Sequence, residues 1–137
     1  MRDYAKMLKE HSLKATFQRM TILSVLDTMG HANIEEIYET VLKTHPTLSL
    51  ATVYKNILTM VQEGVVVEVP ISGEKSKYEL KRDEHLHLIC KKCGSVSDMP
   101  IEESIKEETD KIAKSSSFEP SGRQINIYGI CESCRSA

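Results

Sequence analysis

Apolar residues recur at helical spacing through the first 64 residues of the chain. Between Thr16 and Gly30 they predict an amphipathic helix that begins at the threonine and ends at the glycine, with its apolar face formed by Ile22, Val25, Leu26 and Met29. Asn33 followed by Glu36 three residues later is a capping-box pattern, so a second helix is expected to begin there, and His45-Pro46 is expected to end it. Its apolar positions are Ile34, Ile37, Val41 and Leu42.

A third helix is predicted from Ser49 to Gly64. Its apolar face would consist of Leu50, Val53, Ile57, Met60 and Val61. The pattern then changes to β-rich runs at residues 65–69 and 77–80, separated by a loop that contains Pro70, Ser72 and Gly73. Helices joined by a short turn and followed by a hairpin are typical of a winged helix-turn-helix.

A charged stretch at residues 81–84 interrupts these patterns. We therefore expect a winged-helix domain over residues 1–80, a hinge at 81–84 and a second domain over 85–137. Within the second domain the patterns predict strands at 86–90, 95–99 and 124–130 and a helix at 101–114, whose inner face would carry Ile101, Ile105 and Ile112. The predicted fold class is α+β, with a winged helix followed by a small α/β domain.

Two Cys-x-x-Cys pairs lie in this second half, at Cys90 and Cys93 and at Cys131 and Cys134. Two thiolates at this spacing can point at one ion around a tight turn, and zinc favours four such ligands in tetrahedral geometry. Four protein ligands leave no open position, so the predicted zinc is structural. The alternative interpretation is a pair of redox-active dithiols.

A second set of metal-ligating residue types lies beside the first cysteine pair. His85 and His87 are two positions apart on a predicted strand, so both imidazoles can reach one ion, and Asp98 lies on the next strand. Histidine and carboxylate ligands suit divalent iron, manganese or zinc.

Composition restricts the functional classes. The chain of 137 residues has 18 basic and 20 acidic residues and a net charge of −2, so bulk charge does not mark it as a nucleic-acid binder. It contains no apolar run long enough to span a bilayer and does not begin with a secretion signal, so we expect a cytoplasmic protein with no membrane partner.

The chain resembles bacterial metalloregulators of the ferric uptake regulator (Fur) superfamily over nearly its whole length. The motifs that carry the resemblance are Leu13-Lys14-Ala15-Thr16-x-Gln18-Arg19, Ser49-Leu50-Ala51-Thr52-Val53-Tyr54-Lys55-Asn56, His85-Leu86-His87-Leu88-Ile89-Cys90-x-x-Cys93-Gly94 and Tyr128-Gly129-Ile130-Cys131-x-x-Cys134. The resemblance implies a homodimer with a C-terminal dimerisation domain. It also implies a metal-dependent, non-enzymatic repressor that binds AT-rich inverted repeats in double-stranded DNA.

The resemblance implies a regulatory metal site as well, with one Fe²⁺ or Mn²⁺ per protomer beside one structural Zn²⁺. Its ligands would be His31, Glu79, His85, His87 and Asp98. Spacing alone could not include His31 and Glu79. Iron-uptake regulators of the family tend to have glutamate where this chain has Asp98, whereas peroxide-sensing regulators (PerR-like) tend to have aspartate at both carboxylate positions. We favour the peroxide branch, in which Fe(II) and hydrogen peroxide oxidise His31 or His85, the metal is lost and repression ends.

The third helix would be the recognition helix of such a repressor. Candidate DNA-contacting residues are Thr52, Tyr54, Lys55 and Asn56 on this helix, Lys14 and Arg19 near the start of the first helix, and Lys75 and Lys77 in the wing. Two neighbouring functions in the family are an iron-responsive and a zinc uptake regulator without peroxide sensing. A zinc-ribbon interaction module and a dithiol oxidoreductase are alternatives from other classes.

Overall fold

The computed structural model describes residues 2–71, 73–82 and 84–136, in two compact units, Met1–Lys81 and Arg82–Ala137. Ser72 in the predicted wing loop and Asp83 in the predicted hinge lie outside the described residues. No helix among the described residues is long and apolar enough to cross a membrane.

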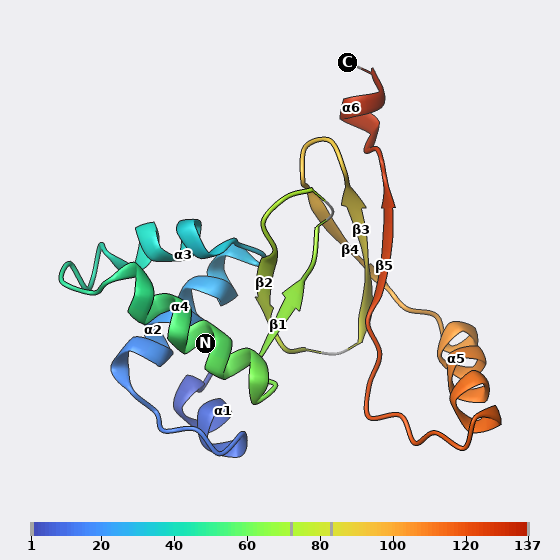
Figure 1. Cartoon of the computed structure of the whole chain (residues 1–137), viewed down its shortest axis with the longest axis horizontal. Helices are drawn as coiled ribbons and strands as arrows, with labels where there is room; N and C mark the ends of the chain where they lie inside the picture. Colours follow the sequence, from blue (N-terminus) through green and yellow to red (C-terminus); the bar gives the residue numbers. More distant parts are fainter. Residues whose placement is uncertain (1, 72, 83, 137) are drawn as a thin grey trace. The chain divides into compact units, whose positions relative to one another are not determined.

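The first unit consists of four helices followed by a hairpin (Figure 1). The elements are α1 (Tyr4–Glu10), α2 (Phe17–Met29), α3 (Ile34–Val41), α4 (Leu50–Gln62), β1 (Val66–Val69) and β2 (Lys77–Leu80). The strands β1 and β2 pair antiparallel, and an isolated bridge joins Ala32 to Tyr78. This arrangement is a winged helix, as the sequence predicts.

Local hydrogen bonds explain where the helices begin. The side chains of Thr16, Asn33 and Ser49 accept hydrogen bonds from backbone N–H groups at the starts of α2, α3 and α4, and Asn33 forms a complete capping box with Glu36. Gly30 ends α2 at a φ of 81°, a backbone conformation that glycine adopts without steric cost. The predicted starts of these three helices are therefore confirmed, whereas α3 ends at Val41, before the predicted end at His45-Pro46.

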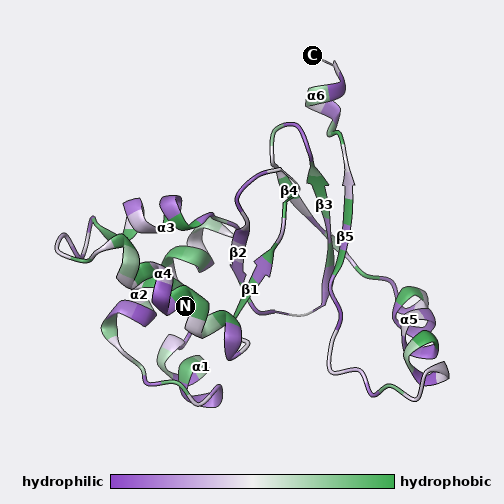
Figure 2. Ribbon diagram, viewed as in Figure 1, coloured by the Kyte–Doolittle hydropathy of each residue, from purple (hydrophilic) through white to green (hydrophobic). Residues whose placement is uncertain are grey.

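The core of the first unit lies where α2, α3 and α4 pack against each other and against the hairpin (Figure 2). Its fully buried side chains include Ile22, Leu23, Ile37, Val53, Ile57 and Met60. Two predicted core positions are wrong, because Met29 and Leu50 are 39% and 42% exposed. Both lie at helix ends, where the helical stripe extends beyond the neighbouring helices.

The second unit is a three-stranded sheet with two helices. Its elements are β3 (His85–Cys90), β4 (Val96–Pro100), α5 (Glu103–Ser115), β5 (Ile125–Gly129) and α6 (Glu132–Ser136). The strand order is β4-β3-β5, in which β3 is antiparallel to β4 and parallel to β5. With the winged helix of the first unit, this confirms the predicted α+β fold class. The sequence did not predict α6.

Few side chains of the second unit are buried in the single chain. Among its described residues only His87, Ile89, Cys90 and Gly94 are buried. Helix α5 buries no residue, and Ile112, which the pattern placed on the inner face, is 67% exposed. A polar residue holds α5 instead: Arg123 binds the Lys106 carbonyl and the side chains of Thr109, Asp110 and Glu84. So thin a core needs a further source of stability.

Candidate metal centres

The two cysteine pairs come together because β3 and β5 are parallel neighbours. Cys90 ends β3 and lies opposite Gly129, near the end of β5. The chain therefore leaves both strands at the same end of the sheet. There it forms one turn carrying Cys93 and another carrying Cys131, with Cys134 on α6.

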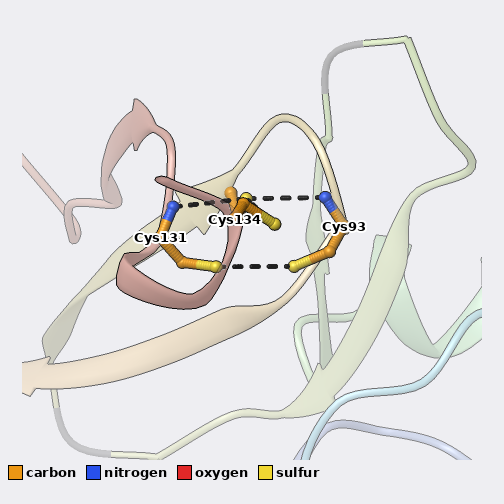
Figure 3. A group of neighbouring side chains, drawn as sticks. Cys93, Cys131 and Cys134 are labelled. Atoms are coloured by element: carbon orange, nitrogen blue, oxygen red, sulfur yellow. Dashed lines mark hydrogen bonds between the residues drawn. The ribbon is translucent and has the colours of Figure 1, made fainter. Parts of the chain in front are cut away.

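The four sulfur atoms form a compact group within 4.8 Å of one another. Figure 3 shows three of these cysteines, Cys93, Cys131 and Cys134. The Sγ atoms of Cys90 and Cys134 are 3.8 Å apart, and so are those of Cys93 and Cys131. A tetrahedron with zinc–sulfur bonds of about 2.3 Å has edges of about 3.8 Å. The sulfur–sulfur distances therefore fit a tetrahedral zinc ion. They are far longer than the sulfur–sulfur bond of about 2 Å in a disulfide.

Backbone amides favour the thiolate that metal binding requires. The N–H groups of Cys131 and Cys93 each lie 3.4 Å from Cys90 Sγ, and these hydrogen bonds lower the pKa of Cys90 to about 6. Contact with the Ser95 hydroxyl lowers the pKa of Cys93. Hydrogen bonding with Cys131 instead raises the pKa of Cys134 to about 12, so an ion must displace a proton there.

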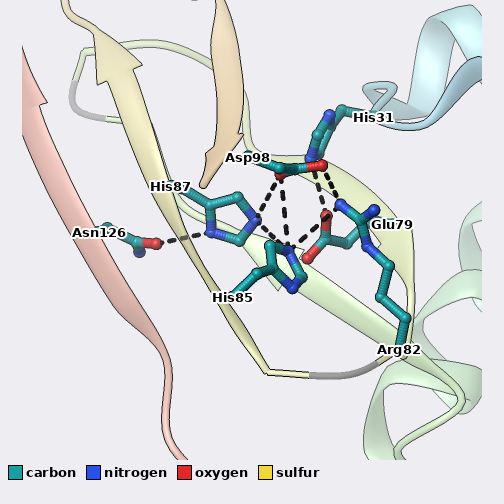
Figure 4. A network of polar contacts seen from close by, with 7 residues as sticks. All are labelled: His31, Glu79, Arg82, His85, His87, Asp98 and Asn126. Atoms are coloured by element: carbon teal, nitrogen blue, oxygen red, sulfur yellow. Dashed lines mark hydrogen bonds and ion pairs between the residues drawn. The ribbon is translucent and has the colours of Figure 1, made fainter. Parts of the chain in front are cut away.

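A histidine–aspartate cluster lies on β3 and β4 of the same unit (Figure 4). His85 and His87 point to one side of β3, with their Nε2 atoms 2.9 Å apart, as the alternation of strand side chains predicts. Asp98 lies directly opposite His87 in the strand register. Its Oδ1 atom is 3.4 Å from His87 Nε2 and 3.6 Å from His85 Nε2.

Two further residues contact this cluster and were not predicted. Asn126 on β5 contacts His87 through Nδ1, the ring nitrogen on the far side from Asp98, at 3.0 Å. Arg82, just before β3, pairs with Asp98 Oδ2 and lies 3.3 Å from His85 Nε2. Asn126 could have been inferred from the β3–β5 register, whereas no sequence pattern indicated Arg82.

In the first unit, His31 and Glu79 form a second histidine–carboxylate pair. His31 Nε2 is 2.7 Å from Glu79 Oε2, and the Glu79 side chain is almost fully buried. The bridge between Ala32 and Tyr78 explains the pairing, since His31 and Glu79 are their immediate neighbours in the chain. The structure thus brings together two residues that are 48 positions apart and that spacing could not connect.

The candidate DNA-contacting residues of α4 differ in how free their side chains are. Tyr54 is 48% exposed and Lys55 is also exposed. The Asn56 amide is engaged on both sides, because its Oδ1 accepts a hydrogen bond from Arg19 Nε and its Nδ2 donates to the Thr52 carbonyl. Asn56 therefore positions Arg19, a contact that the sequence did not reveal.

The remaining candidates lie at the start of α2 and in the wing. The Lys14 carbonyl accepts a second hydrogen bond from Arg19, so the guanidinium is fixed at two points. Lys75 pairs with Glu35 at the start of α3, and this contact lowers the pKa of the Glu35 carboxyl. Lys77 begins β2 and is partly exposed.

A winged helix joined to a small α/β unit with a tetrahedral set of four cysteines and a nearby histidine–aspartate cluster defines a class, the metal-binding winged-helix proteins. Residues 10–128 match the sequence profile of the ferric uptake regulator family, and the chain belongs to this family. It is thus a metal-responsive regulator.

Relatives of this chain include ferric uptake regulators and peroxide regulators. It is 33% identical over 136 residues to a ferric uptake regulation protein of Legionella pneumophila, covering 97% of this chain and 99% of that protein. It is 30% identical over 135 residues to the peroxide operon regulator of Bacillus subtilis, covering 98% and 92%. The crystal structure of the Campylobacter jejuni peroxide stress regulator matches with a TM-score of 0.79 and 35% identity, covering 97% and 100%. Both branches of the family are thus represented among the relatives of this chain.

Proposed function

We propose that this protein is a cytoplasmic, metal-dependent repressor of peroxide-stress and metal-homeostasis genes, released from DNA when hydrogen peroxide oxidises one of its own histidines. The observation that carries the proposal is the cluster of His85, His87 and Asp98, in which two imidazoles and one short carboxylate converge. An aspartate at this position is what the family resemblance associates with the peroxide-sensing branch.

The regulatory ion would be bound by ligands from both units, with His31 and Glu79 contributed by the first and His85, His87 and Asp98 by the second. Nitrogen and oxygen ligands of this kind suit Fe²⁺ and Mn²⁺, whereas the four thiolates suit a structural Zn²⁺. An ion bound by both units stabilises one arrangement of them. Metal would thereby shift the protein toward the DNA-binding form by its higher affinity for that form.

Helix α4 would enter the major groove of an AT-rich inverted repeat. Tyr54 and Lys55 are the exposed candidates for base and phosphate contacts, with Thr52 beside them. Arg19, fixed by Asn56, and the wing residues Lys75 and Lys77 would contact phosphates. A homodimer would place two such helices on the two half-sites of the operator.

The sensing step requires a histidine next to the regulatory ion. Bound Fe(II) would supply the redox chemistry that activates hydrogen peroxide. His31 or His85 would then gain one oxygen atom from peroxide, with water as the other product, and the altered imidazole would no longer serve as a ligand. Each protomer reacts once, so the reaction is self-oxidation rather than enzymatic turnover.

Mass spectrometry of the iron-loaded protein after a mild dose of peroxide tests this proposal. The expected result is the mass of one added oxygen on the peptide that contains His31 or His85, together with loss of operator binding. The manganese-loaded protein is the control, and it should keep both its mass and its DNA affinity. Iron-loaded protein that keeps its mass and still responds to iron would contradict peroxide sensing.

That contrary result would identify an iron-responsive or zinc uptake regulator without peroxide sensing. Glu79 favours this second candidate, because the resemblance associates aspartate at both carboxylate positions with the peroxide branch. Metal content separates both candidates from a zinc-ribbon interaction module. Two ions per protomer are expected of a regulator, and one is expected of the module.

A further inference from the structure

Arg82 contacts the same atoms that a regulatory ion would use. Its guanidinium pairs with Asp98 Oδ2, and its Nη2 atom lies 3.3 Å from His85 Nε2 (Figure 4). An arginine side chain has only donors, so its guanidinium can hydrogen-bond His85 Nε2 only through the lone pair of that nitrogen. Metal binding by this imidazole nitrogen requires the same lone pair.

Asn126 provides a contrast within the same cluster. It contacts His87 through Nδ1, which leaves Nε2 facing Asp98 Oδ1 at 3.4 Å. A partner on the far nitrogen of a metal-binding histidine orients the ring and fixes its tautomer. Arg82 instead contacts the near nitrogen of His85, on the side that faces His87 and Asp98.

We propose that the positively charged side chain of Arg82 competes with the regulatory metal for His85 and Asp98. In the metal-free protein its positive charge offsets the Asp98 carboxylate and keeps the cluster assembled. A divalent ion has to displace the guanidinium from His85, and the remaining charge nearby lowers the affinity for the ion. Arg82 thereby sets the metal concentration at which the protein responds. This inference rests on the proposed regulatory site.

A competing role and an orienting role of Arg82 predict opposite changes in metal affinity when Arg82 is removed. If Arg82 only positioned Asp98 for the metal, its removal would weaken metal binding by about 10- to 100-fold, as is usual for outer-sphere partners of metal ligands. If Arg82 competes with the metal, its removal strengthens binding. The direction of the change therefore decides between the two roles.

Titration of the zinc-replete protein with Mn²⁺, followed by electron paramagnetic resonance of the free ion, tests the inference. We expect Arg82→Ala to bind Mn²⁺ about tenfold more tightly than the unaltered protein, and Arg82→Gln to show the same direction because it too removes the charge. Asn126→Ala should bind Mn²⁺ about tenfold more weakly, since it removes an orienting contact. Zinc content and circular dichroism establish that each variant is folded.

Lys81→Ala is the matched control, because it removes one positive charge from the neighbouring, exposed position. Its Mn²⁺ affinity should stay within about twofold of the unaltered protein, since an exposed charge is screened by solvent. The inference would be overturned if both Arg82 variants bound Mn²⁺ no more tightly than the unaltered protein. It would also be overturned if Lys81→Ala tightened Mn²⁺ binding as much as the Arg82 variants do. Absence of a second ion from the unaltered protein and from every variant would instead overturn the proposed regulatory site itself.

Discussion

At the scale of single residues, hydrogen bonding gives the four cysteines unequal proton affinities. The pKa of Cys90 is lowered by amides of Cys131 and Cys93, whereas that of Cys134 is raised by its thiol neighbours. Their sulfur atoms lie 3.8 Å apart, the same separation as between Cys93 and Cys131 in this group of four. The proton affinities of Cys90 and Cys134 therefore differ although the two sulfur–sulfur distances are the same.

Replacing Cys134 with serine should release the zinc and unfold the second unit, because the described part of that unit has almost no buried core and structural zinc contributes on the order of 10 kcal/mol in small zinc domains. The first unit has its own core and should stay helical. Metal analysis and far-ultraviolet circular dichroism check both points. Ser133→Ala, on the same helix α6, should keep its zinc. A Cys134→Ser variant that keeps the native fold without metal would contradict the structural role.

At the scale of secondary-structure elements, α4 has a buried face and an exposed face with separate roles. Val53, Ile57 and Met60 are fully buried in the core, whereas Tyr54 and Lys55 are exposed. Substitutions on the exposed face should therefore change DNA binding without changing stability.

Reversing the charge of Lys55 to glutamate should lower operator affinity by about a hundredfold, because a favourable phosphate contact becomes a repulsive one. The oligomeric state and the melting temperature should not change. Fluorescence anisotropy with operator DNA at fixed salt concentration measures the effect. Lys9→Glu reverses an exposed charge on α1 and serves as the control. Unaltered affinity of the Lys55 variant would exclude α4 as the recognition helix.

The sequence predicted most elements because their signals are local. Thr16 and Ser49 begin helices through bonds to amides three residues away, and each Cys-x-x-Cys pair lies within one turn. The contacts that the sequence did not show connect distant residues. His31 meets Glu79 only through the Ala32–Tyr78 bridge.

The errors in the predicted buried faces of helices also arise because contacts between distant parts of the chain are not visible in local patterns. A helical stripe shows which residues share a face but not how far the neighbouring elements extend. For this reason Leu50 and Met29 at helix ends proved to be exposed, and Ile112 on α5 lies on a helix that buries nothing in the single chain.

At the scale of the whole molecule, the second unit exposes many apolar side chains. Leu88 and Ile127 lie side by side in the β3–β5 register and are 40% and 51% exposed, and Phe118 and Ile112 are exposed to an even greater extent. In the described sheet β5 is also an edge strand. An exposed apolar surface on an edge strand is suited to pairing with a second copy, which supports the proposed homodimer.

Replacing Ile127 with aspartate should dissociate the dimer, because the carboxylate would be buried without a partner in the interface. Light scattering coupled to size-exclusion chromatography should then give the mass of one chain, 15.5 kDa. Ser121→Asp adds the same charge at an exposed loop position and should stay dimeric. A dimeric Ile127→Asp variant would place the interface elsewhere. A dissociated variant should also bind its operator weakly, since each protomer would contact one half-site.

The parallel pairing of β3 with β5 has a consequence for biosynthesis. Cys93 is synthesised about 38 residues before Cys131, which at 5–20 residues per second corresponds to about 2–8 seconds of translation. During this interval the chain contains two zinc-ligating thiols without the two that complete the site. Binding of zinc by all four cysteines therefore follows translation of the second pair, and until then no bound ion protects the first pair.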